Sequence, residues 1–483
     1  MPASLLVASN RGPLSFVHDE DGGLTGRRGG GGLVSAFTGI GSDAHALWVC
    51  CALGDADRQA ATAAPGGRLD LAGHDTDGLQ VRMLADADGI DAFTFGRAYN
   101  AVANSTLWFL HHLLYATATT PCFDTAFTRE WESFTAYNRA FAAALAEDAA
   151  PGAKVLVQDY HLTLTPRQLR ELRPDLRIAH FSHTPWAPVD YFRLLPDAIA
   201  REVLLGVLGA DHAGFLAPRW VSAFLDCCEQ VLGATVDRGG CTVTYAGRTT
   251  RVAVHALGID PAELRQRSQR PDVATKEQAL RAQIGACKVV ARVDRTELSK
   301  NIVRGLLAYR ELLRRHPEWR RRVVHIAGAY PSRHDLPEYR EYTAHVLRLA
   351  DEIEEEFGEP GWSPLLVSVE DDFARSLATY RVADVLLVNP VRDGMNLVAK
   401  EGPALSDQAC ALILSTEAGA AHELSEHALM VNPYDVSATA DALHRALSMT
   451  PDERRERARG LVAAACALPP QRWFGDQVDA LDA

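Results

Sequence analysis

The stretch from residue 383 to residue 401 constrains the fold more than any other part of the sequence. Residues 383–388 form a short, largely apolar run, which is typical of a strand buried on both faces of a parallel sheet. A polar turn follows and leads into a helical pattern. Ligands bind at this end of a strand in open α/β sheets, and a helix N-terminus offers unpaired N–H groups to an anion. On spacing alone, an ordinary strand–turn–helix with a capping Asp explains the stretch equally well.

The polar residues of this turn suit a ligand that carries hydroxyl groups. The carboxylate of Asp393 can accept hydrogen bonds from sugar hydroxyls, and Gly394 lets the backbone approach a ligand closely. Glu401, about two turns into the expected helix, is placed to accept a ribose hydroxyl.

The same pattern of strand, polar turn and helix recurs along the chain and predicts a doubly wound α/β architecture. The expected strands are residues 5–8, 48–51, 155–158, 178–182, 289–293, 323–327, 365–369 and 383–388, with a hairpin at 242–252. The 483 residues suggest two or more domains, and residues 257–261 are typical of a junction between them. Residues 55–91 are rich in Ala, Asp and Gly, so we expect variable surface structure there.

Several other strand ends carry polar groups that suit a phosphorylated sugar. An Arg at the end of the first strand can hold a phosphate bidentately. Aromatic side chains stack on sugar faces and amide side chains bond sugar hydroxyls, although about half of such clusters are simply core. Arg and Lys near a helix start suit a leaving diphosphate, whose charge grows as its bond breaks. The residues in question are Arg11, Tyr99, Asn104, Trp108, Asp159, Tyr160, His161, His183, Arg295 and Lys300. The Gly-rich residues 29–32 match no phosphate-loop pattern, and a plain flexible loop explains them equally well.

Composition narrows the class of protein. A net charge of −13, from 49 basic and 62 acidic residues, lacks the basic footprint of a nucleic-acid-binding protein. The nine Cys contain no Cys-x-x-Cys pair, which favours free thiols in a reducing cytosol over disulfides or a zinc site. The N-terminal residues do not resemble a signal peptide, and no apolar run approaches the ~20 residues that cross a bilayer. We therefore expect a soluble cytoplasmic protein without membrane partners.

The longer motifs, in one order along the chain, resemble those of the trehalose-6-phosphate synthase family. They are Ser9-Asn10-Arg11, Gly31-Gly32-Leu33, Tyr99-Asn100, Asp159-Tyr160-His161-Leu162, His183, Arg193-Leu194-Leu195-Pro196, Arg295 with Lys300, Pro331-Ser332-Arg333, and residues 393–401. Residues 295–300 and 330–335 look most like the actinobacterial branch of that family.

The resemblance implies a GT-B fold, in which two Rossmann-like doubly wound domains face a central cleft. The acceptor-binding domain would be residues 1–258, the nucleotide-sugar-binding domain 259–468, and residues 469–483 a helix packing back toward the first domain. The implied reaction is retaining glucose transfer from a nucleoside diphosphate glucose to glucose 6-phosphate, which gives α,α-trehalose 6-phosphate.

The resemblance also implies roles for single residues. The implied catalytic residues are His183, Arg295, Lys300 and Asp393; the donor-binding residues are Gly32, Arg295, Lys300, Asp393, Gly394, Met395, Asn396, Leu397 and Glu401; and the acceptor-binding residues are Arg11, Tyr99, Trp108, Asp159, Tyr160 and Arg333. No metal or other cofactor is expected, because Arg and Lys can neutralise the leaving group, and a homo-oligomer is compatible with the family.

Four departures from the family pattern concern the ligand sites. Cys51 replaces a common Trp, Gln158 replaces the usual His before Asp159, Glu297-Leu298 replaces Asp-Tyr, and Gly402-Pro403 follows Glu401 where an aromatic residue is usual. The last two lie near the donor nucleotide. Since GDP-glucose is a donor in the actinobacterial branch, GDP-glucose is favoured over UDP-glucose.

Two other functions compete with this one. A pseudo-glycosyltransferase would join a nucleotide-linked cyclitol to another phosphorylated acceptor, but residues 393–396 suit a sugar donor. A catalytically silent sensor of sugar phosphate would bind the same anions without turnover.

Overall fold

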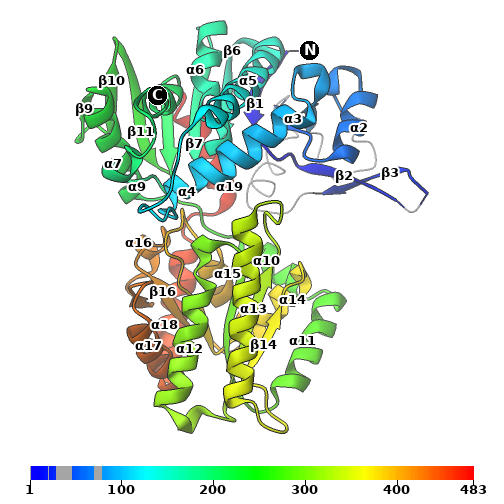
Figure 1. The fold of residues 1–483 in the computed structure, drawn as a ribbon, viewed down its shortest axis with the longest axis vertical. Coiled ribbons are helices and arrows are strands. Elements are labelled where there is room, and N and C mark those ends of the chain that lie inside the picture. The colour runs from blue at the N-terminus through cyan, green and yellow to red at the C-terminus, as the bar shows by residue number, and fades with distance from the viewer. Residues whose placement is uncertain (1, 20, 29–45, 70–78, 483) are drawn as a thin grey trace. The chain divides into compact units, whose positions relative to one another are not determined.

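The computed structural model describes residues 2–19, 21–28, 46–69 and 79–482, which form two compact units (Figure 1). Unit 1 comprises Met1–Leu257 and Pro470–Ala483, and unit 2 comprises Gly258–Pro469. These limits differ by one residue at each junction from the domain boundaries inferred from the sequence.

Among the described residues, unit 1 is built on a sheet of nine strands in the order β5-β4-β1-β6-β7-β8-β11-β10-β9. The strands from β5 to β11 are parallel, and β10 and β9 add an antiparallel edge. The bounds are β1 Ala3–Ala8, β4 Ala46–Cys51, β5 Gln80–Leu84, β6 Ala149–Gln158, β7 Arg177–Ser182, β8 His212–Phe215, β9 Thr235–Asp237, β10 Thr242–Tyr245 and β11 Arg248–Val254. The chain runs outward from β1 in one direction and from β6 in the other, so the strand order reverses between β1 and β6. Ligands bind in doubly wound sheets at such a reversal.

The longest helix of unit 1 is α5, Thr125–Asp148. Asp124 caps its N-terminus, and the Asp124 carboxylate accepts hydrogen bonds from the backbone N–H groups of Ala126 and Phe127. Its apolar stripe, which includes Phe134 and Phe141, is fully buried. The other helices are α2 Asp55–Ala63, α3 Ala92–Gly96, α4 Trp108–His111, α6 Thr165–Leu172, α7 Val189–Phe192, α8 Asp197–Val207, α9 Pro218–Cys227 and α19 Pro470–Asp479, with π-helical turns at Arg97–Leu107 and Cys228–Leu232 and 3₁₀ turns at Pro65–Gly67, Asp86–Asp88 and Tyr160–Leu162.

The expected strands of unit 1 and the hairpin with Ala246-Gly247 at its turn are confirmed. The expectation for residues 55–91 is wrong in part, because they contribute α2 and the largely buried strand β5. The strand is hard to predict from the sequence, since it is only five residues long and Gln80 and Arg82 interrupt its apolar residues. A second hairpin, β2 Leu14–His18 with β3 Leu24–Arg28, extends from the same side of the unit (Figure 1).

Unit 2 has a sheet of six parallel strands, in the order β14-β13-β12-β15-β16-β17. The bounds are β12 Lys288–Arg295, β13 Val323–Tyr330, β14 Leu365–Ser368, β15 Val385–Val388, β16 Ala411–Ser415 and β17 Leu429–Val431. Here the strand order reverses between β12 and β15. These two strands end at Arg295 and at Val388, five residues before Asp393, so the fold brings the two motifs together.

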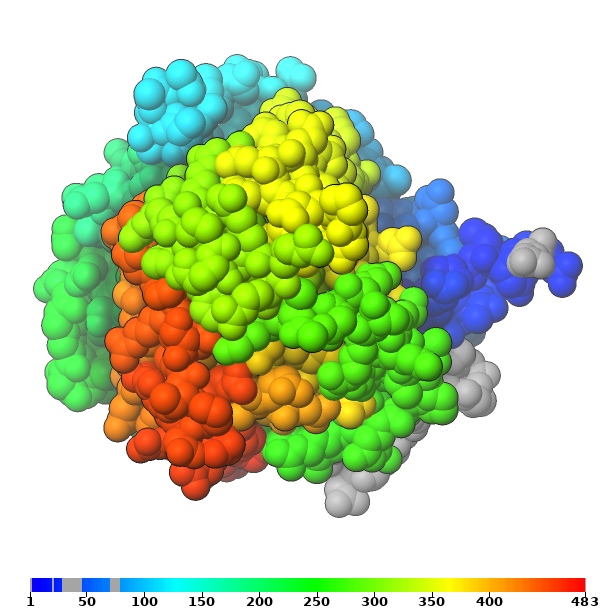
Figure 2. All heavy atoms as spheres, turned by 90° about the horizontal axis from the view of Figure 1, so that it is seen from below, coloured from blue at the N-terminus to red at the C-terminus, as the bar shows by residue number. Residues whose placement is uncertain are grey.

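Helices cover both faces of this sheet. They are α10 Pro261–Ser268, α11 Pro271–Ile284, α12 Ile302–Arg315, α13 Pro337–Phe357, α14 Phe373–Val382, α15 Val398–Leu405, α16 Ala421–Leu424, α17 Val436–Ser448 and α18 Pro451–Ala465, with 3₁₀ turns at Leu298–Lys300 and Pro317–Trp319. In Figure 2, α12 and α13 lie side by side in yellow-green on the surface of unit 2, with α17 next to α12 in orange-red.

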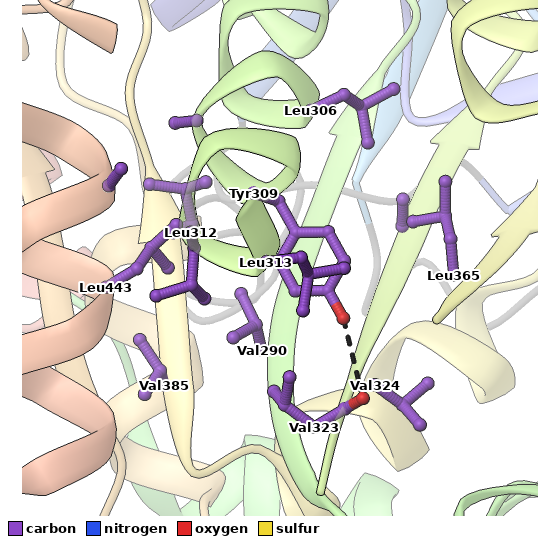
Figure 3. Packing of buried hydrophobic residues seen from close by; sticks show 14 of the residues in the cluster. Val290, Leu306, Tyr309, Leu312, Leu313, Val323, Val324, Leu365, Val385 and Leu443 are labelled. Carbon is purple, nitrogen blue, oxygen red and sulfur yellow. Dashed lines mark hydrogen bonds between the residues drawn. The ribbon is translucent and has the colours of Figure 1, made fainter. Parts of the chain in front are cut away.

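The apolar face of α12 forms the centre of the unit 2 core. Leu306, Tyr309 and Leu313 recur at helical spacing and are fully buried against β12 and β13 (Figure 3). Burial of each Leu contributes roughly 1.5–3 kcal/mol. The Tyr309 hydroxyl donates to the carbonyls of Pro364 and Val323 at 2.8 and 3.5 Å, so the one polar atom of this face is satisfied. Within the described ranges, no helix has the length and apolar character that crossing a bilayer requires.

Candidate active site

In unit 2, the reversal of strand order brings Lys300 and Asp393 together. Lys300 follows β12, Asp393 follows β15, and the two strands are parallel neighbours. The Lys300 ammonium lies 2.6 Å from Asp393 Oδ2, and both side chains are 13% exposed. This largely buried pair joins the two sequence motifs that suit a diphosphate and a sugar.

The Lys300 ammonium is stabilised by surrounding carboxylates. Burial disfavours its charged form, but the attraction of Asp393 and Glu297 outweighs burial and raises the pKa of Lys300. Lys300 is therefore a permanent cation at neutral pH. An anionic ligand can take over this ammonium from Asp393.

The loop after β15 is held from two sides. Asn396 adopts φ 74° and donates from Nδ2 to Asp393 Oδ2 at 3.0 Å. The N–H of Gly419 donates to the Asp393 carbonyl at 3.0 Å, and a Cβ added at Gly419 would lie 1.8 Å from the Gly394 carbonyl oxygen. Only a residue without a side chain allows this approach. Met395, which has its carbonyl bonded to the N–H of Ala420, is buried.

Helix α15 begins at Val398, after Leu397 at its N-cap position. Glu401 therefore lies in the first turn, and the expected distance of two turns is wrong, because residues 393–397 form a loop and not a helix. Burial raises the pKa of Glu401 to about 6. A hydrogen bond from the Tyr380 hydroxyl at 3.4 Å acts in the opposite direction but is the smaller effect. A half-buried carboxylate at this position can accept hydrogen bonds from vicinal hydroxyls.

Glu297 is a fully buried carboxylate that two arginines share. Its Oε1 lies 2.9 Å from Arg295 Nη1 and 3.3 Å from Arg333 Nη1, and it accepts from the Ser332 hydroxyl at 2.8 Å. Burial would raise its pKa, but Arg295, Arg333 and Lys300 lower it to about 2. The carboxylate therefore stays ionised and holds both guanidinium groups at one place.

In unit 1, Asp159 stands at the carboxyl end of β6 in a strained conformation. Its φ of 74° and ψ of 168° belong to a region that is almost exclusive to glycine. Its N–H donates to the Phe181 carbonyl at 2.6 Å, and its Oδ1 accepts from the N–H of His183 at 3.2 Å. The strain aims the Asp159 carboxylate at the turn after β7, where His183 lies.

The His183 imidazole is neutral in the physiological range. Burial and the neighbouring His180 lower its pKa to about 3. Its Nε2 lies 2.9 Å from Gln158 Oε1. His183 is therefore a hydrogen-bonding group and not a cation.

The aromatic residues predicted for the acceptor form one cluster beside Asp159. Tyr99 stacks on His161 with ring centroids 5.6 Å apart, and Trp108 lies 5.8 Å from Tyr160. The Tyr160 hydroxyl donates to Asn104 Oδ1 at 2.9 Å. Trp108 and Tyr160 are buried, whereas Tyr99 is half-buried, so Tyr99 is the most accessible ring of the cluster.

Arg11 and Gly32 are the other two residues of unit 1 that the sequence predicts to bind ligands. Arg11 follows β1 at the reversal of strand order in unit 1, and its side chain is exposed. Gly32 lies outside the described residues.

Sequence reasoning missed several residues that shape the site. The sequence marks Glu297 only as a departure from a family pattern, although its acidic side chain between Arg295 and Lys300 is a signal for this role. Gly419 follows a strand end, but the need for glycine there depends on the Gly394 carbonyl, which no local pattern indicates. Tyr380 and Gln477 reach the site from distant segments and carry no local signal.

One group of side chains among the described residues has a spacing that could hold a metal ion: His316, Glu318 and His444. It lies beyond the C-terminal end of α12, about 20 Å along the helix from Lys300 at 1.5 Å per residue. The His316 and His444 rings are stacked 3.7 Å apart, and His444 Nδ1 accepts from the Trp319 indole, which does not suit joint ligation of one ion.

Comparison with known proteins places these features in a family. Residues 3–483 match the model of glycosyltransferase family 20. A trehalose-6-phosphate synthase of Mycolicibacterium gilvum is 35% identical over 496 residues, covering 99% of this chain and 93% of the relative. A bifunctional trehalose-6-phosphate synthase/phosphatase of Thermoproteus tenax is 37% identical over 386 residues, covering 79% of this chain and 51% of the relative, so the chain spans about half of that longer protein.

Solved structures agree with this assignment. The E. coli protein bound with UDP-2-fluoro glucose has a TM-score of 0.85 at 27% identity, covering 99% of this chain and 98% of that one. The Burkholderia xenovorans α,α-trehalose-phosphate synthase in complex with glucose 6-phosphate has a TM-score of 0.83 at 26% identity, covering 99% and 100%. The GT-B fold class inferred from the resemblance is confirmed, and the chain belongs to glycosyltransferase family 20, the family of the trehalose-6-phosphate synthases.

Proposed function

We propose that this protein transfers glucose from a nucleoside diphosphate glucose to glucose 6-phosphate and releases α,α-trehalose 6-phosphate. The observation that carries the proposal is the buried Lys300–Asp393 pair beside Arg295, at the reversal of strand order in unit 2. A cation for a diphosphate and a carboxylate for sugar hydroxyls stand there side by side. The family and the two ligand complexes of its relatives support the same reaction class.

In the proposed reaction, the bond between the anomeric carbon and the β-phosphate oxygen breaks. The acceptor hydroxyl forms its bond to the anomeric carbon on the same face, and its proton passes to the departing phosphate. The products are trehalose 6-phosphate and a nucleoside diphosphate, with retained configuration. No protein nucleophile is needed, and the cations supply electrostatic stabilisation of the leaving group.

On the donor side, the diphosphate replaces Asp393 as the partner of Lys300. This exchange frees the Asp393 carboxylate for glucose hydroxyls at the moment when the diphosphate arrives. Arg295 carries the second positive charge, Gly394 to Leu397 approach the phosphates with their backbone, and Glu401 accepts the ribose hydroxyls. Gly32 is assigned to the same subsite.

On the acceptor side, Tyr99, Trp108 and Asp159 line the sugar, and His183 lies close to the reacting centre. Arg11, Tyr160 and Arg333 bind the phosphate. The Tyr160 hydroxyl donates a hydrogen bond to Asn104 Oδ1, so it must give up this bond in order to donate to the phosphate.

We propose that the reaction needs no metal ion, because Arg295 and Lys300 neutralise the charge that grows on the leaving phosphate. Activity that survives exhaustive chelation supports this assignment. Loss of activity on chelation, restored by one divalent cation, contradicts it.

We favour GDP-glucose as the donor. The basis is the altered donor region, where Glu297-Leu298 and Gly402-Pro403 depart from the common family pattern. The test is the release of nucleoside diphosphate with glucose 6-phosphate and GDP-, UDP- or ADP-glucose, compared side by side. Fastest release from UDP-glucose overturns the preference for guanine but keeps the reaction.

Absence of release with all three donors overturns the proposed reaction. Cyclitol phosphates would then be the next acceptors to test, as a pseudo-glycosyltransferase requires. Arg295→Ala separates an enzyme from a silent sensor of sugar phosphate, because a sensor has no turnover to lose.

A further inference from the structure

Three hydrogen bonds join the candidate catalytic histidine to the last helix of the chain. His183 Nε2 lies 2.9 Å from Gln158 Oε1, and Gln158 Nε2 lies 3.3 Å from Gln477 Oε1. Gln477 Nε2 in turn lies 3.3 Å from the carbonyl oxygen of Trp473. Gln158 and Gln477 are each 1% exposed, so water cannot replace their partners. We call these bonds the glutamine relay.

The far end of the relay fixes the direction of every bond in it. A backbone carbonyl can only accept a hydrogen bond, so Gln477 must direct its NH₂ group at Trp473. Its oxygen then faces Gln158, which must direct its own NH₂ group at that oxygen. The oxygen of Gln158 is left for His183, so Nε2 of His183 carries the proton.

Turning either the Gln158 amide alone or both glutamine amides leaves two acceptor oxygens facing each other. If the Gln158 amide alone were turned, its oxygen would face the oxygen of Gln477, and two buried acceptors would be in contact. If both amides were turned, the Gln477 oxygen would face the Trp473 carbonyl. Each alternative leaves buried polar atoms without donors, which costs about 1–3 kcal/mol per atom.

We infer that Gln158 and Gln477 are positioning residues that hold His183 as its Nε2–H tautomer and leave Nδ1 as the ring atom that accepts a hydrogen bond from a sugar hydroxyl. The assignment of the tautomer stands on the relay itself, and the role of the sugar hydroxyl rests on the proposed function.

The relay explains how the neutral imidazole of His183 can present one defined tautomer to a substrate. The two neutral tautomers of histidine are close in energy, so a ring without a fixed partner presents a mixture to its substrate. Because burial lowers the pKa of His183 to about 3, no protonation step interferes between about pH 5 and 8. The orientation of Gln158 alone then decides which nitrogen faces a substrate as an acceptor.

The direct test is a long-range ¹H–¹⁵N spectrum of the protein labelled at histidine, which separates protonated from unprotonated ring nitrogens. The His183 signals are identified by their loss in His183→Asn. We expect a protonated Nε2 and an unprotonated Nδ1 in the wild-type chain, unchanged between about pH 5 and 8. A protonated Nδ1 in the wild-type chain overturns the inference.

Substitutions along the relay test its direction. Gln158→Met keeps the approximate shape of the side chain but removes the oxygen that accepts from His183 Nε2. The ¹⁵N chemical shifts of both His183 ring nitrogens should then move toward the averaged values of a mixture of tautomers. Gln477→Met should have the same effect on His183, because the Gln158 amide loses the partner that fixes its orientation and can rotate by half a turn. Gln477→Glu should keep the wild-type spectrum while its buried carboxyl is protonated, since one oxygen still accepts from Gln158 and the O–H donates to the Trp473 carbonyl. An unchanged tautomer in Gln158→Met, or equal spectra for Gln477→Met and Gln477→Glu, overturns the relay.

Gln168→Met is the matched control. Gln168 is a half-buried glutamine of unit 1 that donates to the Thr135 carbonyl at 3.3 Å, and it lies outside the relay. Its substitution should leave the His183 spectrum and the activity unchanged. A spectral change in Gln168→Met equal to that in Gln158→Met would show a general loss of packing and overturn the specific role.

The kinetic readout is a split between kcat and KM. Loss of one hydrogen bond to the ring should lower kcat about fivefold in Gln158→Met, with a smaller change in KM. If the wild-type chain releases no nucleoside diphosphate, the proposed function fails while the tautomer result still stands. If it turns over and Gln158→Met keeps the wild-type kcat and tautomer, only the relay fails.

Discussion

Three residues that the sequence motifs place at the site have left-handed backbone conformations. Asp159, Arg333 and Asn396 have φ angles of 74°, 49° and 74°. Such conformations cost on the order of 1–3 kcal/mol for residues other than glycine and concentrate at functional sites. The motifs predicted these residues as site candidates but not this strain, because it depends on contacts made in the fold, such as the hydrogen bond from the N–H of Asp159 to the Phe181 carbonyl.

Glu297 is the residue whose charge is most useful to test. Since it holds Arg295 and Arg333 at one oxygen, Glu297→Gln should release both guanidinium groups from their positions. We expect KM to rise about tenfold for the donor and for glucose 6-phosphate, because hydrogen bonds to charged groups contribute roughly 1.5–3 kcal/mol. Steady-state kinetics with each substrate varied in turn measures both effects.

The chain offers a matched control for this variant. Glu277 is also shared by two arginines of unit 2, with Arg281 at 2.7 Å and Arg381 at 2.8 Å, but it joins α11 to α14. Glu277→Gln should leave both KM values unchanged. If Glu297→Gln changes the KM of one substrate only, the shared anchoring of the two arginines is wrong.

Glu401 makes donor binding depend on pH. Its pKa of about 6 lies above the ordinary value for a glutamate, so the group takes up a proton below about pH 6. The protonated form is the poorer acceptor for ribose hydroxyls, and ligand binding favours the ionised form. The donor KM should therefore rise as the pH falls from 7 to 5, by up to about tenfold at pH 5.

The control for this pH dependence is Glu401→Gln, which cannot ionise. Its donor KM should be high and should not change between pH 5 and 7. A donor KM that rises equally in the variant and in the wild-type protein would assign the titration to another group.

At the scale of elements, the close contact between the loop after β15 and the turn after β16 determines the backbone geometry of the proposed donor site. The turn after β16 contains Gly419, whose N–H holds the Asp393 carbonyl. Gly419→Ala would drive a Cβ to 1.8 Å from the Gly394 carbonyl oxygen, so the two loops must separate. We expect donor binding to weaken at least tenfold, with a loss of about 1–3 kcal/mol of unfolding free energy from overpacking.

Calorimetric titration with a nucleoside diphosphate, together with thermal unfolding, tests this expectation. Gly54→Ala is the control, because a Cβ at Gly54 meets nothing within 4 Å and its φ is −146°. Wild-type nucleotide affinity in Gly419→Ala would contradict the proposed place of the donor.

The elements themselves were predictable to different degrees. Strands such as β6, β12 and β15 could be predicted because short apolar runs end in polar turns. The first helical residue of α15 could not, because Asn396 and its contact with Asp393 form a loop where a helical pattern already begins. The π-helical turn at Arg97–Leu107, which carries Tyr99 and Asn104, follows no sequence rule that separates it from an α-helix.

At the scale of the whole molecule, topology brings the candidate ligand-binding residues of each unit together within that unit. In both sheets the strand order reverses once between parallel strands, and the polar motifs follow the two strands at that reversal. Sequence patterns predicted the strands and a domain junction at residues 257–261, and the likeness to a known family implied the bounds of two domains. Strand order itself depends on long-range pairing, which local patterns do not encode.

The last helix of the chain belongs to the first unit, so a substitution there should act on unit 1 alone. Trp473 of α19 is 1% exposed and meets Phe181 of β7 edge-on, with ring centroids 5.0 Å apart. Trp473→Ala should lower the unfolding free energy of unit 1 by about 3–5 kcal/mol. Hydrogen exchange should then accelerate in β6 and β7 and stay unchanged in β12 and β13, and nucleoside diphosphate affinity should be kept.

Trp319→Ala supplies the reciprocal experiment. Trp319 is 7% exposed in the core of unit 2, so its loss should accelerate exchange in β12 and β13 and leave β6 and β7 protected. Because each unit has its own sheet and its own hydrophobic core, local destabilisation should remain within it. Equal acceleration in both units by either variant would show that the chain unfolds as one cooperative body, and the division into units would then describe its geometry but not its stability.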